Sequence, residues 1–159
     1  MSEPSSLDVG ALAPDFKAVA VGGEYGEGTS VTLSQFRGKR VVLYFYPRDL
    51  TPGCTQQACA LRDHWGEVSG RAVVFGVSTD GPASHRKFIE KEGLPFPLLS
   101  DESGELVRAY GVWVEKKMYG RTSMGTERST FVIGADGKLE AVFRKVSPKT
   151  HLEQVLGAI

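Results

Sequence analysis

The chain contains two cysteines, Cys54 and Cys59, and their context indicates thiol redox chemistry. Thr51, Pro52 and Cys54 are typical of a helix start, with Thr51 as the N-cap, Pro52 at the first helical position and Cys54 at the third. Free backbone N–H groups and the positive end of the helix dipole favour an anion in this turn, and the reactive form of cysteine is the thiolate anion. The sequence therefore predicts a reactive thiolate at Cys54.

Cys59 lies on the same predicted helix, five residues beyond Cys54. Residues five apart in an α-helix have Cα atoms roughly 8.7 Å apart and point about 140° apart around the axis. A disulfide needs Cα atoms within about 7 Å of one another. The two cysteines therefore cannot pair while the helix is intact, and pairing would require the first turn or two of the helix to unwind.

Two predicted strands flank this helix and position its first turn. Residues 41–46 are uniformly apolar, which predicts a strand buried on both faces that ends at Pro47. The helix presents one apolar stripe, made of Cys54, Ala58, Leu61, Trp65 and Val68. Residues 72–77 predict a second buried strand, parallel to the first, which completes a βαβ unit. Cys54 would then lie at the carboxyl end of a central strand, where α/β sheets place their sites.

The rest of the chain predicts a mixed sheet with helices on both faces. The further predicted elements are strands at 15–21 and near Val31, a helix at 82–92, a brief strand at 98–100, helices at 103–110 and 148–156, and strands at 129–133 and 139–144. Asp136 and Gly137 suit a type I′ turn between the last two strands. Residues 111–126 are interpreted as a loop.

Composition and charge indicate one folded domain over residues 1–159, with residues 1–10 flexible. The 19 Lys and Arg residues balance 19 Asp and Glu residues, which argues against nucleic acid or an anionic membrane as an obligatory partner. No apolar run approaches the ~18 residues of a membrane span, and the N-terminus lacks the regions of a signal peptide. We therefore expect a cytoplasmic protein, in which a two-cysteine disulfide is more often catalytic than structural.

The sequence shows no sign of a metal centre or a bound cofactor. His64, His85 and His151 have no mutual spacing typical of metal ligands, so we expect ordinary surface positions for them. The glycine-rich residues 22–30 lack the G-x-G-x-x-G order of a dinucleotide site. We therefore expect neither a metal nor another cofactor.

A signature around the first cysteine is similar to that of a known family. Pro47, Thr51 and Cys54 fit the P-x-x-x-T-x-x-C pattern of peroxiredoxins, and the surrounding YFYPRDLTPGCTQQACALRD resembles the bacterioferritin comigratory protein, or peroxiredoxin Q, subgroup. The likeness extends through APDF, GVSTDGPASHRKF, LPFPLLSDESGELVRAYGVW and ERSTFVIGADGK. Leu50 stands where a polar residue is usual and Val114 where glycine is common.

The resemblance implies a thioredoxin-like fold, with a central mixed β-sheet flanked by helices and an N-terminal β-hairpin extension. It implies a thiol peroxidase for hydrogen peroxide and organic hydroperoxides, with Cys54 as peroxidatic thiol, Cys59 as resolving thiol and Arg128 as active-site arginine. An external dithiol such as thioredoxin or a glutaredoxin-like protein would reduce the disulfide. Because an intramolecular pair removes the chemical need for a dimer, we expect a monomer.

Each of these residues would have a role in the reaction. The Cys54 thiolate would attack the terminal peroxide oxygen and become a sulfenic acid. Arg128 directly precedes a predicted strand, and its guanidinium could hold the thiolate and the peroxide oxygens together. The Thr51 hydroxyl can both donate to and accept from the peroxide, while Pro47 and Pro52 fix the turn and shield it.

Other interpretations stay open at this point. A copper-binding assembly factor on the same fold would use two cysteines and a distant histidine, although such proteins usually space the cysteines four apart and are exported or membrane-anchored. A non-catalytic redox-responsive protein or holdase would bind partners regardless of peroxide. Sequence alone favours Arg128 as a surface residue paired with Glu127, and only the family resemblance reverses this interpretation. Cys59 could be a residue of the helix surface.

Overall fold

The computed structural model of the protein describes residues 7–159. The first six of the ten residues expected to be flexible lie outside this range. In the remaining four, the Gly10 N–H donates a hydrogen bond to the Leu139 carbonyl at 2.9 Å. Among the described residues, no helix is both long and apolar enough to cross a membrane.

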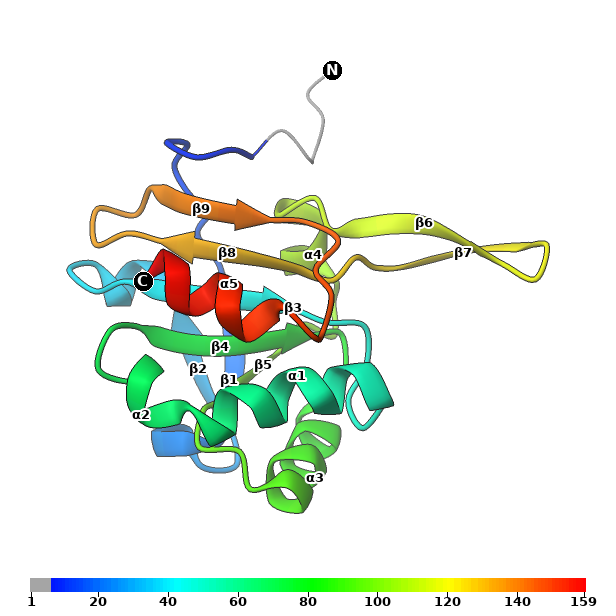
Figure 1. Cartoon of the computed structure of the whole chain (residues 1–159), viewed down its shortest axis with the longest axis horizontal. Coiled ribbons are helices and arrows are strands. Elements are labelled where there is room, and N and C mark those ends of the chain that lie inside the picture. Colours follow the sequence, from blue (N-terminus) through cyan, green and yellow to red (C-terminus); the bar gives the residue numbers. More distant parts are fainter. Residues whose placement is uncertain (1–6) are drawn as a thin grey trace.

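A seven-stranded mixed sheet forms the centre of the molecule, with strand order β2-β1-β5-β4-β3-β8-β9 (Figure 1). The strands are β1 (Lys17–Val21), β2 (Thr29–Thr32), β3 (Val41–Phe45), β4 (Val73–Ser78), β5 (Leu98–Ser100), β8 (Ser129–Ile133) and β9 (Leu139–Phe143). The β3, β4 and β5 strands run parallel, and the other neighbours pair antiparallel. The parallel β3–β4 pair confirms the predicted βαβ unit, and the β1–β2 hairpin confirms the predicted N-terminal extension.

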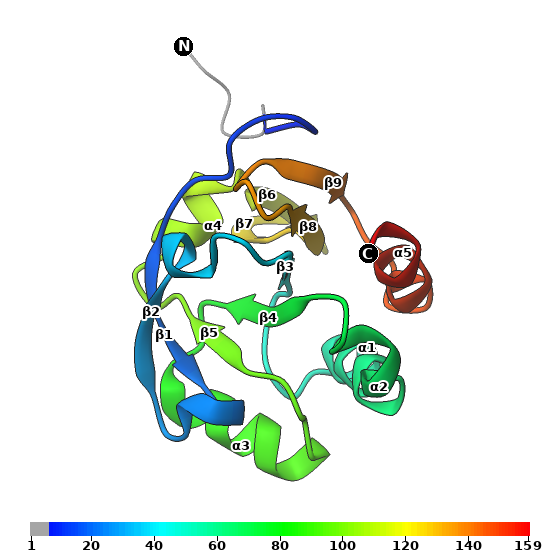
Figure 2. The same ribbon diagram turned by 90° about the vertical axis from the view of Figure 1, so that its left-hand side faces the viewer.

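Helices cover both faces of this sheet (Figure 2). They are α1 (Pro52–Asp63), α2 (Trp65–Val68), α3 (Pro82–Glu92), α4 (Glu105–Ala109) and α5 (His151–Ala158), with short 3-10 helices at Gly23–Tyr25 and Leu33–Phe36. The predicted apolar stripe is divided between α1 and α2, because the helix breaks at His64. The predicted helix over 82–92 has the bounds of α3, and Gly93 ends it in the left-handed conformation at φ 62°.

The central strand β3 contributes to two hydrophobic cores, one on each face. Val41, Leu43 and Phe45 pack in the core that includes the α4 side chains. Val42 and Tyr44 pack in the core that includes side chains of α1, α3 and α5. Successive side chains of a strand point to opposite faces, so burial of all five β3 residues follows from helices on both sides. This arrangement confirms the prediction of a strand buried on both faces.

The loop predicted for residues 111–126 is wrong, because the segment forms a β-hairpin. The strands β6 (Trp113–Met118) and β7 (Arg121–Thr126) pair only with each other and extend from the body at one end of the sheet (Figure 1). Their turn is Tyr119-Gly120, with φ 54° and 76°. A type I′ turn requires positive φ at both central residues, and Tyr at the first of them is not the Asn or Asp that signals such a turn.

The turn predicted at Asp136 and Gly137 also differs. Within this pair only Gly137 has a positive φ, 84°, so the turn is not type I′. The Gly134 N–H donates to the Lys138 carbonyl at 2.8 Å, and the β8–β9 register shifts between Val132 and Ile133. At this shift β9 has one more residue than β8, which forms a β-bulge. Sequence signals for a two-residue turn do not reveal such a bulge.

Close packing at Gly76 in β4 leads to a prediction about stability. A Cβ there would lie 2.7 Å from Leu98 Cδ2 and 2.8 Å from the Tyr44 hydroxyl. We expect Gly76→Ala to lower the free energy of unfolding by about 1–3 kcal/mol, the range for overpacking a core, as measured by urea denaturation. Gly66→Ala is the control, since a Cβ at Gly66 meets nothing within 4 Å. Equal stability of the two variants would contradict the packing argument.

Candidate active site

The start of α1 has the backbone that the sequence predicts. Thr51 is extended at the N-cap position, with φ −90° and ψ 154°, and Pro52 is the first helical residue. The side-chain role expected of an N-cap is wrong, however. The Thr51 hydroxyl makes no capping hydrogen bond to the helix and instead donates to the Arg48 carbonyl at 2.8 Å. The N–H groups of this first turn therefore stay available to an anion.

Arg128 brings a positive charge to the sulfur of Cys54. It directly precedes β8, and its Nη1 donates to Cys54 Sγ at 3.4 Å and to Gln57 Oε1 at 2.7 Å. Cys54 is only 1% exposed and Gln57 is fully buried. A buried anion needs a partner charge to offset its lost hydration, and the guanidinium supplies one. Gln57, which sequence reasoning missed, holds the guanidinium in place from the next turn of α1.

Glu127 is not the partner of Arg128. Its carboxylate instead accepts from the Ser129 hydroxyl at 3.4 Å and lies 3.9 Å from Arg144 Nη1. The interpretation of Arg128 as half of a surface pair with Glu127 is therefore wrong. Glu127 and Arg128 directly precede β8 and have different partners, so the Arg128 guanidinium reaches α1.

Gly53 makes room for the guanidinium. A Cβ at this position would lie 3.1 Å from Arg128 Nη2 and 3.4 Å from Pro148 Cγ. A side chain at this position would therefore crowd the Arg128 guanidinium where it contacts the neighbouring Cys54. The small residue between Pro52 and Cys54 thus has a packing reason that is visible only once β8 is in place.

A buried carboxylate, Asp49, anchors the turn between β3 and α1. Its Oδ1 accepts from the Tyr46 hydroxyl at 2.5 Å, and its Oδ2 accepts from the Ser84 hydroxyl at 2.9 Å and lies 2.6 Å from His85 Nδ1. The turn also contains Leu50 in the left-handed region at φ 65°, a conformation that costs a residue with a Cβ about 1–2 kcal/mol. The contacts of Asp49 with α3 offset this cost.

Two of the three histidines are buried, so the expected surface positions are wrong for His85 and His151. His85 has partners at both ring nitrogens, Asp49 at Nδ1 and the Leu99 carbonyl at Nε2, 2.9 Å away. Because a carbonyl only accepts, Nε2 carries a proton. His64 is exposed, as expected. The sequence does not reveal this burial, because the hydrogen-bond partners that offset the cost of burying the two rings lie on other elements.

Pro47 and Lys116 complete the surroundings. Pro47 is half-buried directly after Tyr46, and its missing N–H helps to end the strand. Lys116 of β6 donates from Nζ to the Thr126 carbonyl at 2.6 Å. Burial lowers the pKa of Lys116, and the charge of Arg128 lowers it further, whereas Cys54 and Glu127 oppose the shift. The β6–β7 hairpin thus brings a second cation toward the Cys54 end of the sheet.

Cys59 does not contact Cys54. Both cysteines are free thiols within an intact α1, and Cys59 is half-buried with its Sγ 3.4 Å from Glu92 Oε1 on α3. Burial raises the pKa of the Cys59 thiol, and the hydrogen bond to Glu92 raises it further. The structure thus agrees with the helical geometry that keeps the two sulfurs apart.

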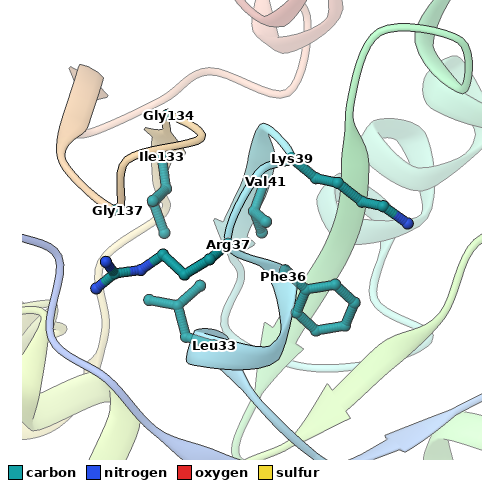
Figure 3. Close-up of a pocket in the computed structure, with 8 residues that line it drawn as sticks. All are labelled: Leu33, Phe36, Arg37, Lys39, Val41, Ile133, Gly134 and Gly137. Atoms are coloured by element: carbon teal, nitrogen blue, oxygen red, sulfur yellow. The ribbon is translucent and has the colours of Figure 1, made fainter.

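The cavity in Figure 3 is not part of this site. It has a volume of about 10 Å³ and lies against Val41 at the start of β3, whereas Cys54 follows the end of that strand. Such a volume holds no more than about one water molecule. Within residues 7–159, no group of three or more His, Cys, Asp or Glu side chains could hold a metal ion.

The contact between Arg128 and Cys54 yields a prediction about thiol reactivity. We expect Arg128→Ala to slow alkylation of Cys54 by iodoacetamide at pH 7 by at least about tenfold, because the thiolate is the reactive form and a hydrogen bond to a charged group contributes about 1.5–3 kcal/mol. Alkylation would be followed by mass spectrometry across a pH series in the Cys59→Ser background. Arg71→Ala, which removes an exposed arginine, is the control. An unchanged alkylation profile in Arg128→Ala would rule out stabilisation of the thiolate by this residue.

His151 yields a prediction about pH and stability. Its Nε2 lies 2.8 Å from Thr130 Oγ1, and burial together with the charge of Arg128 lowers its pKa from 6.5 to about 3. Below pH 6.5, His151 binds a proton in the unfolded chain but stays neutral in the folded protein. The free energy of unfolding therefore falls as the pH falls. Between pH 7 and 5 this loss should be about 2 kcal/mol. Chemical denaturation should show a pH dependence smaller by that amount in His151→Gln, and equal slopes would contradict the assignment.

Comparisons with known proteins agree with this arrangement. A family model described as the AhpC/TSA family matches residues 9–142. Peroxiredoxin Bcp of Bacillus subtilis is 45% identical over 152 residues, covering 95% of this chain and 94% of the relative. Peroxiredoxin Bcp of Escherichia coli is 45% identical over 151 residues, covering 94% of each. Among solved structures, Xanthomonas campestris peroxiredoxin Q matches with TM-score 0.84 and 37% identity, covering 98% of this chain and 96% of that one. With its thioredoxin-like fold, the chain belongs to the AhpC/TSA family and, within it, to the Bcp, or peroxiredoxin Q, group of peroxiredoxins.

Proposed function

We propose that this peroxidase uses Cys54 as the peroxidatic thiol and Cys59 as the resolving thiol. The observation that carries the proposal is the buried Cys54 sulfur at the start of α1, with Arg128 Nη1 3.4 Å away. The thiolate attacks the terminal oxygen of the peroxide, the S–O bond forms and the O–O bond breaks. The departing hydroxide or alkoxide takes up a proton and leaves as water or alcohol, and Cys54 is left as a sulfenic acid.

The neighbouring residues have distinct roles in this step. Arg128 holds the thiolate and stabilises negative charge as it develops on the peroxide oxygens, and Gln57 orients the guanidinium. Thr51 offers its hydroxyl to the incoming peroxide once it leaves the Arg48 carbonyl, and Pro47 shields the turn. A substrate held between the guanidinium and these N–H and O–H groups has its reacting oxygen directed at the sulfur.

Disulfide formation then requires a change of conformation. Cys54 and Cys59 share α1 and have separate partners, Arg128 and Glu92, so the first turn of the helix must unwind before the sulfurs meet. An external dithiol, thioredoxin or a glutaredoxin-like protein, reduces the product by thiol–disulfide exchange. Hydrogen peroxide and alkyl hydroperoxides are the proposed substrates. Alkyl peroxide reduction is the activity named for the bacterioferritin comigratory protein of Xanthomonas campestris, which is 36% identical to this chain.

The same proposal treats residues 1–159 as one domain that acts as a cytoplasmic monomer, because both cysteines of the cycle belong to one chain. Neither alternative function is favoured. A copper site would need Cys54 and Cys59 to converge on one ion, whereas each sulfur contacts a side chain of a different element. A non-catalytic role would not require the contact between the Cys54 sulfur and the Arg128 guanidinium.

A coupled assay with thioredoxin, its reductase and hydrogen peroxide tests the two cysteine assignments. Cys54→Ser should abolish peroxide turnover, because no sulfenic acid can form. Cys59→Ser should complete one turnover and stop with a Cys54 sulfenic acid, which a dione reagent traps for mass spectrometry. Peroxide turnover retained in Cys54→Ser would refute the nucleophile, and normal cycling in Cys59→Ser would remove Cys59 from the mechanism.

A further inference from the structure

The side chain of Cys59 contacts a carboxylate outside the peroxide-binding turn. Its Sγ lies 3.4 Å from Oε1 of Glu92, the last residue of α3. The α1 and α3 helices lie on the same face of the sheet (Figures 1 and 2). Because a carboxylate only accepts, the thiol is the donor in this contact. Cys59 is therefore held as a protonated thiol, pointing at the group that could remove its proton.

Arg62 fixes Glu92 and joins the two helices. Its Nη1 donates to the Glu92 backbone carbonyl at 2.6 Å and lies 3.9 Å from Glu92 Oε1, while its Nε donates to Asp63 at 2.9 Å. Arg62 is one helical turn beyond Cys59, on the same face of α1. The Glu92 side chain is only 19% exposed. The carboxylate is thus partly desolvated and held next to the thiol from both the main chain and the side chain.

These contacts divide α1 into two parts. The start of the helix has no side-chain cap, whereas residues 59–62 are tied to the end of α3. The start of α1 is held by Arg128 through Cys54 and Gln57. Unwinding of the first turn must therefore release the Arg128 contacts, while Cys59 can stay beside Glu92.

Building on the proposed peroxidase cycle, we propose that Glu92 is the general base that deprotonates Cys59 for its attack on the Cys54 sulfenic acid. The proton of the Cys59 thiol passes to the Glu92 carboxylate, and the thiolate attacks the Cys54 sulfur. The S–S bond forms, the S–O bond breaks, and the departing hydroxide takes the proton back from Glu92 and leaves as water. The charged and titratable groups near Cys59 are Arg62, Asp63, Glu92 and the buried phenol of Tyr44. The base is Glu92, the carboxylate in contact with the thiol.

The experiment measures the two steps of one turnover separately. Reduced protein is mixed rapidly with one equivalent of hydrogen peroxide, quenched in acid and analysed by mass spectrometry, which distinguishes the Cys54 sulfenic acid from the disulfide. The variants are Glu92→Gln, which keeps the size and one acceptor oxygen but removes the base, and Glu92→Asp, which keeps a carboxylate. Glu90→Gln removes an exposed carboxylate of the same helix and is the matched control.

At pH 7 we expect Glu92→Gln to form the sulfenic acid at the wild-type rate and the disulfide about 100-fold more slowly, at the low end of what a general base contributes. The defect should shrink as the pH rises, because hydroxide can then ionise the thiol, and Glu92→Asp should recover part of the rate. Glu90→Gln should match the wild type in both steps.

Two results would overturn the role of Glu92 as a base. One is a disulfide rate in Glu92→Gln that equals or exceeds the wild-type rate, which would make Glu92 only a restraint on α1. The other is a defect of the same size at every pH, which would mark a purely positional effect. If the wild-type protein forms neither the sulfenic acid nor the disulfide after peroxide, the proposed function is overturned instead, so the two failures are distinguishable.

Discussion

The charge contact between the Arg128 guanidinium and the Cys54 sulfur is the constraint on which the rest of the site depends. A sulfur that is 1% exposed can carry negative charge only beside a fixed positive group, because water cannot supply the lost solvation. The contact requires β8 to start where α1 starts, and it requires Gly53 to leave space above the first turn. Gln57 holds the guanidinium, and Asp49 with the buried His85 ties the turn before α1 to α3. The proposed peroxidatic site is thus preorganised from segments more than 70 residues apart in sequence, as the separation of Arg128 and Cys54 shows.

In the proposed cycle, the same helix that organises this site must also unwind at its start. Its stability is unevenly distributed, since the first turn has no side-chain cap and the second half is held to α3 by Arg62. A turn that leaves its N–H groups free favours an anion. Unwinding of this turn must release the contacts of Arg128 with Cys54 and Gln57. The Cys59–Glu92 contact lies in the part of α1 that is held to α3, which gives the proposed resolving thiol a defined position.

The β6–β7 hairpin places further groups around the site without joining the main sheet. Lys116 extends from it toward the region where Cys54 and Arg128 meet, and burial makes its charge costly. The hairpin strands pair only with each other, and Trp113 at the start of β6 packs against the core. Relatives such as peroxiredoxin Q of Xanthomonas campestris share the fold over 98% of this chain at 37% identity. This match extends over nearly the whole chain, so the fold as a whole is shared with that relative.

The sequence by itself determined the local features: the strand-turn-helix unit, the helix start with Cys54 in its first turn, the separation of Cys59 from Cys54, and the bounds of α3. These follow from hydrophobic periodicity, capping residues and the fixed geometry of a helix, all of which act within a few residues. Only the tertiary structure decided that Arg128 pairs with Cys54 and not Glu127, that His85 and His151 are buried, that residues 113–126 form a hairpin, and that Glu92 contacts Cys59. Each of these depends on which side chains meet across separate elements. Burial of a polar group is favourable only when its partner is present, and a local pattern carries no record of that partner.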